Sequence, residues 1–314
     1  MSSVSTSAPT SQAGARSLLV PYLALAAGVL CISFTAIFTK WAGVPGPVAA
    51  AWRMLVATAV LAIPFAREAR RWTDKERAGL KWGVMGGLWF AVNLALLNSA
   101  LLLTSAANAT LLDNTAPIWV GLGALFLFKE KLRGRYWIGL ALALAGAAVV
   151  TGFNPAAGIR LQAGDALAFT GALFYAGYLL NTQRARRNLS GLSYAWIIAA
   201  AAAVALFVIS LVMGLPLTGY GLRSYSALLA VGLISQAGGW LLIGYALGYL
   251  PASAAVIVLL AQPVVTGLLA VPLLGEALTL RQGIGGALAL AGIYLCLRSN
   301  GGTAAVAASE GVTP

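Results

Sequence analysis

The sequence contains no histidine and two cysteines, Cys31 and Cys296, each inside an apolar run. The lack of histidine excludes catalysis by an imidazole base and metal sites built on histidine. Two cysteines in such positions give no disulfide framework. Charged residues make up 9% of the chain, against about 25% in soluble domains. No water-soluble fold covers its surface with so few charges, so an integral membrane protein is predicted.

The apolar runs of this 60% hydrophobic chain set the number of membrane spans. A spanning helix needs about 20 apolar residues, and the two longest runs must each reverse once. The sequence therefore predicts an all-α integral membrane protein with ten transmembrane helices. Their predicted positions are Ser17–Thr39, Trp41–Ala66, Trp82–Phe128 (two helices, turning at Leu103–Ser105), Tyr136–Ile159, Ala166–Gln183, Asn188–Leu222, Ser224–Gly275 (two helices, turning at Gly248–Pro251) and Gln282–Leu297.

The 20 basic and 8 acidic residues give a net charge of +12. With the N-terminus inside, the cytoplasmic side receives Arg16, Arg298 and the loops 67–81, 129–135 and 184–187. Four basic residues fall on the other side: Lys40, Arg160, Arg223 and Arg281. This bias is the one that orients bacterial membrane proteins, so both termini are predicted to be cytoplasmic. The basic residues are dispersed over short loops, which argues against binding of nucleic acid.

An internal repeat divides the chain. The segment Pro117–Glu130 aligns without a gap on Pro263–Glu276, and at the same offset Ile138–Gly146 aligns on Ile284–Gly292. A duplication of five spans makes the two copies cross the membrane in opposite directions, as in many secondary transporters. The predicted organisation is a disordered cytoplasmic tail (1–17), repeat 1 (18–153), an inverted repeat 2 (164–298) and a second disordered cytoplasmic tail (299–314).

At this point the sequence resembles a known family. The ten spans, the duplicated segment with its proline and glutamate, Lys40 closing the first span and Arg53 early in the second are similar to the EamA-type branch of the drug/metabolite transporter superfamily. The closest resemblance is to bacterial exporters of amino acids, especially aromatic ones, and of metabolites. One departure is the absence of a basic counterpart of Arg53 in the second repeat, where Ile197 follows Trp196.

Two charges are predicted deep within the spans, Arg53 and Asp113. Intramembrane charges are costly and default to functional hypotheses. On one interpretation Arg53, together with Lys40, attracts a substrate carboxylate, while Asp113 meets an ammonium group or carries a coupling proton. On the other, which the sequence slightly favours, Arg53 and Asp113 form a structural ion pair.

A second group of candidates consists of amides and aromatic residues within the spans. Trp89 and Asn93, like Gln236 and Trp240, are four residues apart and share one helix face. The predicted substrate-binding residues are Trp89, Asn93, Asn98, Tyr175, Tyr178, Asn181, Gln236, Trp240 and Gln262. Pro117 and Pro263 each free a backbone carbonyl within a span and are predicted to form either hinges or static bends.

These features favour a secondary transporter in the bacterial inner membrane that exports amino acids, preferably aromatic or other apolar ones, and related small metabolites by alternating access. The alternatives are a carrier of nucleotide sugars or sugar phosphates, or a channel. Neither catalytic residues nor a cofactor or metal is expected. The chain carries no phosphate-binding loop with Gly-Lys-Ser/Thr. The expected partners are the small-molecule substrate and membrane lipid, and the sequence is compatible with a monomer.

Overall fold

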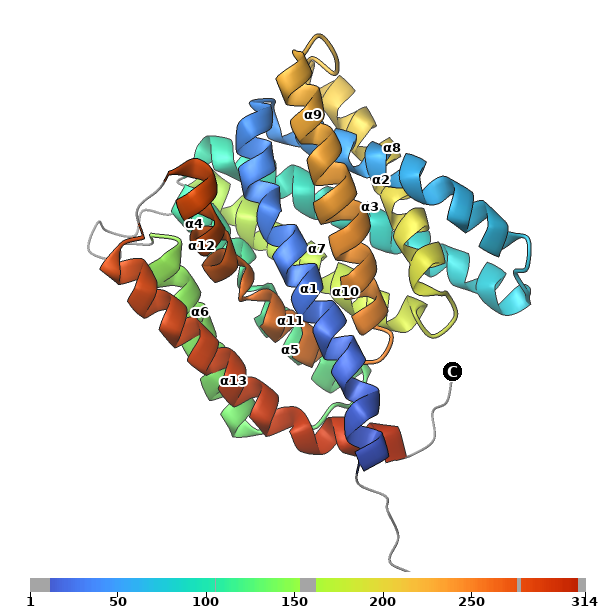
Figure 1. Cartoon of the computed structure of the whole chain (residues 1–314), viewed down its shortest axis with the longest axis vertical. Coiled ribbons are helices and arrows are strands. Elements are labelled where there is room, and N and C mark those ends of the chain that lie inside the picture. Colours follow the sequence, from blue (N-terminus) through green and yellow to red (C-terminus); the bar gives the residue numbers. More distant parts are fainter. Residues whose placement is uncertain (1–11, 105, 153–161, 276–277, 310–314) are drawn as a thin grey trace, which may run out of the picture.

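The computed structural model describes residues 12–104, 106–152, 162–275 and 278–309, and every regular element in these ranges is a helix (Figure 1). The predicted all-α class is therefore confirmed. Nine helical segments of the described ranges are long and apolar enough to cross a membrane. A shorter apolar helix of 17 residues, α6, ends the first half of the chain.

The first half of the chain contains six helices. Two of them, α4 and α5, together make one span that is interrupted at Asn114 and Thr115. The bounds are α1 Gln12–Ala42, α2 Gly46–Ala69, α3 Asp74–Leu103, α4 Ala106–Asp113, α5 Ala116–Leu127 and α6 Gly134–Val150.

The second half repeats this order with more interruptions. The eighth span of the chain is a continuous helix, but its middle part is π-helical, because the stretch η2 joins α9 and α10. The bounds are α7 Ala163–Ala185, α8 Gly191–Val212, α9 Leu222–Ala230, η2 Val231–Gly239, α10 Trp240–Ala246, α11 Ala252–Leu259, α12 Gln262–Leu274 and α13 Leu280–Ser309. Helices α1 and α13 thus reach into the stretches predicted as tails, whose outermost residues, 1–11 and 310–314, lie outside the described ranges.

The two halves pair in a symmetric way. Helix α2 packs against α8 and α6 against α13, which are equivalent elements of the two repeats. Helix α3 packs against α7, and the equivalent contact in the other half joins η2 and α10 to α1. This exchange of partners is what an inverted duplication produces.

The contact between α6 and α13 is made by glycines at equivalent positions. Gly146 faces the backbone of Gly285 and Ala289, and its repeat partner Gly292 faces the backbone of Gly139 and Ala143. A Cβ atom at either glycine would collide with backbone atoms of the opposite helix. Small residues allow helices in a membrane to approach this closely, so the sequence repeat corresponds to a physical seam between the halves.

Two spans break at equivalent points before a proline. Pro117 is the second residue of α5 and Pro263 the second residue of α12. Proline lacks the N–H that would bond the preceding turn and clashes with the carbonyl four residues earlier. In the breaks the Thr115 and Ala261 N–H groups bond carbonyls three residues back, on Leu112 and Val258. Both spans are thus interrupted just before Pro117 and Pro263, and the choice between hinges and static bends stays a prediction.

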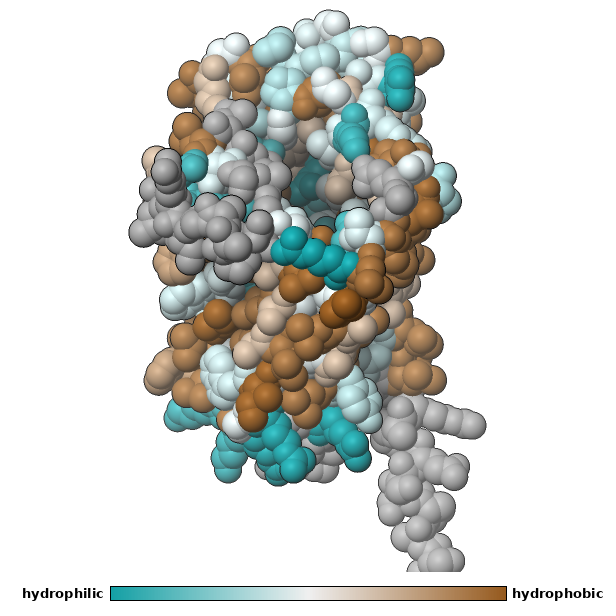
Figure 2. Space-filling model, turned by 90° about the vertical axis from the view of Figure 1, so that its left-hand side faces the viewer, coloured by the Kyte–Doolittle hydropathy of each residue, from teal (hydrophilic) through white to brown (hydrophobic). Residues whose placement is uncertain are grey.

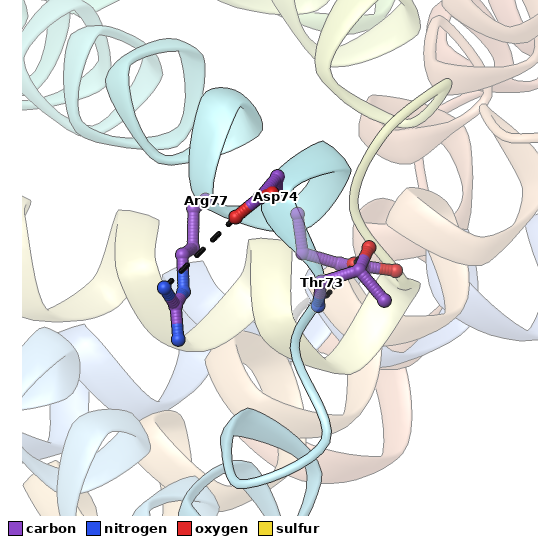
Figure 3. A network of polar contacts seen from close by, with 4 residues as sticks. Thr73, Asp74 and Arg77 are labelled. Carbon is purple, nitrogen blue, oxygen red and sulfur yellow. Dashed lines mark hydrogen bonds and ion pairs between the residues drawn. The ribbon is translucent and has the colours of Figure 1, made fainter.

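Helix α3 starts at a capping box. The Thr73 N–H donates to Glu76 Oε2 at 2.8 Å, and Thr73 Oγ1 also bonds this carboxylate. Asp74 and Arg77 form an exposed ion pair of 4.0 Å in the same turn (Figure 3). Such a pair contributes little stability, whereas the Glu76 carboxylate satisfies the N–H group of the N-cap residue Thr73.

Candidate functional site

A cavity of about 200 Å³ lies between the two halves of the molecule. Both broken spans contribute to it, and so do α1, α2, α3, α7 and α10. On the face that carries α6, α12 and α13, Figure 2 shows a hollow with hydrophilic residues in its depth, in the half of the molecule away from the start of α1. The cavity is lined by Ile32, Thr35, Arg53, Phe90, Asn93, Leu94, Leu97, Asp113, Asn114, Pro117, Tyr175, Trp240, Val256, Leu259, Leu260 and Gln262.

Arg53 enters the cavity from α2. Its guanidinium carbon lies 5.9 Å from the centre of the Phe90 ring, which is within the range of a cation–π contact. Its Nε atom is buried and has no hydrogen-bond partner. Among the described residues no carboxylate lies within 4.0 Å of the guanidinium nitrogens. Arg53 is therefore a cation with a buried Nε atom and with no anionic partner among the described residues.

Asp113 is the last residue of α4, at the start of the break. Asn93 Nδ2 donates to Asp113 Oδ1 at 2.9 Å and also to the carbonyl of Gly171 on α7 at 3.1 Å. Asn93 therefore fixes the carboxylate relative to two neighbouring helices. Asp113 does not pair with Arg53 although both line the cavity, so the structural ion pair favoured by the sequence is not formed.

Three aromatic rings, those of Phe90, Tyr175 and Trp240, line one side of the cavity, and the ring of Tyr178 packs behind them. The ring of Phe90 lies 4.7 Å from Tyr178, 5.0 Å from Trp240 and 6.5 Å from Tyr175, measured between ring centres. Tyr175 and Trp240 are 6.3 Å apart, with their planes nearly perpendicular. Such separations are typical of aromatic packing. The cavity thus has an apolar aromatic wall beside its two charged groups.

The structure brings seven of the predicted residues to this cavity. They come from both halves of the chain and are Arg53, Asn93, Asp113, Pro117, Tyr175, Trp240 and Gln262. Tyr178 and Gln236 are buried next to it and line a much smaller space of about 10 Å³, which Trp240 shares. The Gln236 Oε1 atom is buried without a partner.

The remaining predicted residues do not line the cavity. Asn98 Nδ2 donates to the carbonyl of Leu94 one turn back, at 2.6 Å, and its side chain covers Gly46. Trp89 lies over Gly177 and, with Asn181, lines a separate groove between α3, α5 and α7. Lys40, in the last turn of α1, and Pro263 are absent from the lining.

Comparison with known proteins assigns the fold to a family. The model of the EamA-like transporter family matches twice, over residues 19–152 and 162–298. The chain belongs to the EamA-like transporter family. The two matches coincide with the two halves described above, and this EamA-like protein is accordingly a multi-pass membrane transporter.

Relatives of this EamA-like transporter carry little further information on substrate. An uncharacterized transporter of Clostridium kluyveri is 26% identical over 222 residues, which are 68% of this chain and 71% of that protein. The uncharacterized transporter YwfM of Bacillus subtilis is 28% identical over 198 residues, or 60% of this chain and 64% of its own length. A crystal structure that shares 23% identity superposes with a TM-score of 0.73 over 90% of this chain and 96% of the other, which supports the fold alone.

Among the aromatic residues that line the cavity of the EamA-like protein, the sequence did not single out Phe90. The sequence suggested a face through Trp89 and Asn93, whereas the residues on the cavity are Phe90, Asn93, Leu94 and Leu97. Both sets have helical spacing. The signal in the sequence that could have identified Phe90 is its spacing from Asn93, Leu94 and Leu97, which places these four residues on one face of α3.

The two repeats contribute unequally to the cavity. Arg53, Asn93 and Asp113 all belong to the first match of the family model, and the second match supplies Trp240, Gln262 and an apolar wall. The repeat alignment places Leu259, the last residue of α11, opposite Asp113, the last residue of α4. The scaffold is therefore symmetric, while its charged groups are not.

Proposed function

We propose that this EamA-like transporter exports amino acids, preferably aromatic or other apolar ones, together with related small metabolites, across the bacterial inner membrane by alternating access. The observation that carries the proposal is the cavity between the halves, which holds one unpaired cation and one carboxylate next to an aromatic wall. An amino acid carries the complementary anion, cation and side chain.

The electrostatics of the cavity favour a zwitterion. A charge removed from water is costly unless it is paired and hydrogen-bonded, and Arg53 has no carboxylate partner in the described chain. A substrate carboxylate at Arg53 and a substrate ammonium at Asp113 would supply both missing partners. Tyr175 and Trp240 then face the substrate side chain.

The broken spans support a binding site at this point. Helix α5 and helix α12 both begin at the cavity, where Pro117 and Gln262 line it, while α4 and α11 end there with Asp113 and Leu259. Interrupted helices at the interface of inverted repeats commonly form transporter sites, because the positive ends of half-helices attract anionic groups.

Contacts between the halves close the opposite end of the molecule, where α1 begins. Glu68, at the end of α2, accepts hydrogen bonds from Ser190 and Ser193 at the start of α8. Glu130, after α5, accepts one from Ser253 in the first turn of α11. Access from one side with closure at the other is the arrangement that alternating access requires.

The competing substrate classes fit less well. Nucleotide sugars and sugar phosphates carry a dianionic phosphate, which favours several basic residues at the site. Arg53 is the one basic residue among the described residues that line the cavity. A channel would use rings of charges or a filter loop, and neither is visible in the described ranges. The monomeric state, the inner-membrane location and the cytoplasmic termini stay predictions.

The test is transport by purified protein reconstituted in liposomes. We expect exchange of radiolabelled phenylalanine, tryptophan and leucine above that of empty vesicles, with weaker exchange of acidic amino acids. Decarboxylated analogues, which cannot meet Arg53, are expected to compete poorly. Flux of a sugar phosphate without flux of any amino acid would overturn the proposed substrate class.

A further inference from the structure

A second hollow, separate from the cavity lined by Arg53 and Asp113, runs along the surface where α7 of the second half packs against the first half of the chain. This groove of about 680 Å³ lies between α3, α5 and α7. Its deep part is apolar and contains Trp89, Trp119 and Leu180. Its end near the α5–α6 connection and the C-terminus of α7 is strongly basic, with Lys129, Arg184 and Arg187.

The basic end of the groove is held by aromatic rings. The Arg184 guanidinium carbon lies 4.3 Å from the centre of the Trp82 ring, and that of Arg187 lies 5.6 Å from the Phe128 ring. Lys129 follows α5 with a left-handed backbone (φ 55°). No carboxylate of the described chain lies within 4.0 Å of the charged nitrogens of Lys129, Arg184 or Arg187. The three cations are thus placed together without an internal anion.

The apolar part of the groove faces the region that lipid occupies. Leu127 and Leu173 line it and are 68% and 40% exposed, and Phe126 beside them is 73% exposed. All three belong to helices that meet the criteria for membrane spans. Large exposed apolar side chains on a spanning helix contact acyl chains, since lipid is their solvent. Arg184, by contrast, lies in the last turn of α7, at the membrane boundary.

We propose that this groove binds a phospholipid with an anionic headgroup, whose phosphate is held by Arg184, Arg187 and Lys129 and whose acyl chains follow the apolar part past Trp89 and Trp119. Basic pockets between transmembrane helices favour anionic headgroups. A free phosphate would contact the cations and leave the apolar part of the groove empty. The presence of a basic end and an apolar part in one groove therefore favours a lipid.

The fixed geometry of the basic end supports a defined site. Asn181 Nδ2 donates to the carbonyl of Trp82 at 2.6 Å and so joins α7 to α3 at the tryptophan whose ring carries the guanidinium of Arg184. Guanidinium groups of arginine that stack on aromatic faces present their N–H groups in a planar fork, which suits phosphate.

The binding test titrates dioleoyl phosphatidylglycerol into the purified full chain in detergent and counts retained lipid by native mass spectrometry. Dioleoyl phosphatidylcholine serves as the neutral lipid. We expect phosphatidylglycerol to be retained preferentially. The variant Arg184→Gln/Arg187→Gln is expected to bind it about 25-fold more weakly, because each basic residue near a membrane surface contributes about 1 kcal/mol, or about fivefold.

The matched control is Arg70→Gln/Arg71→Gln, which removes two exposed arginines after α2 that do not line the groove. Parent-like retention is expected for it. If the double groove variant does not fold, Arg187→Gln alone is expected to weaken retention about fivefold. Equal retention of phosphatidylcholine, displacement by equimolar inorganic phosphate, or parent-like retention by the groove variants would each overturn the proposal.

Discussion

Arg53 and Asp113 line the same cavity between the halves without pairing with each other. Asp113 instead accepts a hydrogen bond from Asn93, and the Nε of Arg53 has no partner. Two opposite charges held apart in this way leave room for a ligand between them. Under the function proposed above, a bound zwitterion would offset the cost of keeping them unpaired away from water.

The first prediction concerns Arg53. The variant Arg53→Gln is expected to lower exchange of labelled phenylalanine about tenfold to a hundredfold, since a hydrogen bond to a charged group contributes about 1.5–3 kcal/mol. The measurement is counterflow in proteoliposomes at matched protein density. Arg53→Lys, which keeps the charge, should retain part of the activity. Parent-like exchange by Arg53→Gln would remove this residue from substrate binding.

Asp113→Asn separates substrate binding from proton coupling. The amide oxygen can still accept from Asn93 Nδ2, as Asp113 Oδ1 does at 2.9 Å, so folding is expected to be kept. We expect weaker amino acid binding and a pH profile of the remaining flux that is similar to the parent. If the variant instead loses a proton-driven component that the parent shows, Asp113 is the coupling site.

The two tryptophans on α3 and α10 form a matched pair. Trp240→Ala is expected to slow flux of aromatic amino acids about threefold to tenfold, because it removes a ring from the cavity wall. Trp89 faces the groove between α3, α5 and α7, so Trp89→Ala should leave the preference among amino acids unchanged. Both variants are compared by size-exclusion profile before flux is measured. A shifted preference in Trp89→Ala would contradict the assignment of the two faces.

A stability prediction concerns the seam between α6 and α13. Gly146→Ala forces a methyl group against the backbone of Gly285 and Ala289, and overpacking of this kind costs about 1–3 kcal/mol. Gly283→Ala, in the same pair of helices, meets no atom within 4 Å and should be neutral or slightly stabilising. Melting followed by tryptophan fluorescence in detergent distinguishes them, and equal melting temperatures would refute the seam.

The last prediction uses the Glu130 carboxyl in the connection between α5 and α6. Burial raises its pKa, although hydrogen bonds from Ser253 and Gln183 act in the opposite direction. A folded-state pKa above the unfolded value adds stability that is complete below the unfolded pKa, about 4.3, and is lost as the pH rises through the folded-state pKa. Relative to Glu130→Gln, the parent should therefore melt at progressively lower temperature as the pH rises from the unfolded pKa through the raised folded-state pKa. Parallel pH profiles of the two proteins would show that Glu130 does not titrate in this way.

Much of the fold follows from the sequence. The long charge-free runs give the spans, and the aligned Pro117 and Pro263 locate the two breaks, because charge and missing N–H groups act locally. The π-helical stretch η2 has no such local signal. Residues 231–239 contain three glycines, Ser235 and Gln236, a composition that occurs in α-helical spans as well, and their winding depends on what packs around them.

The candidate site was predictable in kind and less so in geometry. The depth of a residue in the membrane follows from the number of residues between it and the end of its helix. On this basis Arg53 and Asp113 were expected at a similar depth. Rotation about the helix axis cannot be read from α3, since a helix that is apolar all round gives no amphipathic reference. For this reason Trp89 was expected where Phe90 lies. Whether Arg53 and Asp113 meet depends on Asn93, whose amide competes for the carboxylate.

The uneven distribution of charge between the repeats has a consequence for how specificity can change. The seam of α6 and α13 and the paired helix breaks need both copies of the repeat, so substitutions there disturb the common framework. Arg53, Asn93 and Asp113 lie in one copy. A lineage of such carriers can therefore acquire a new cargo by altering a few positions of one half, while the other half, and the mechanics shared by both, stay as they were inherited.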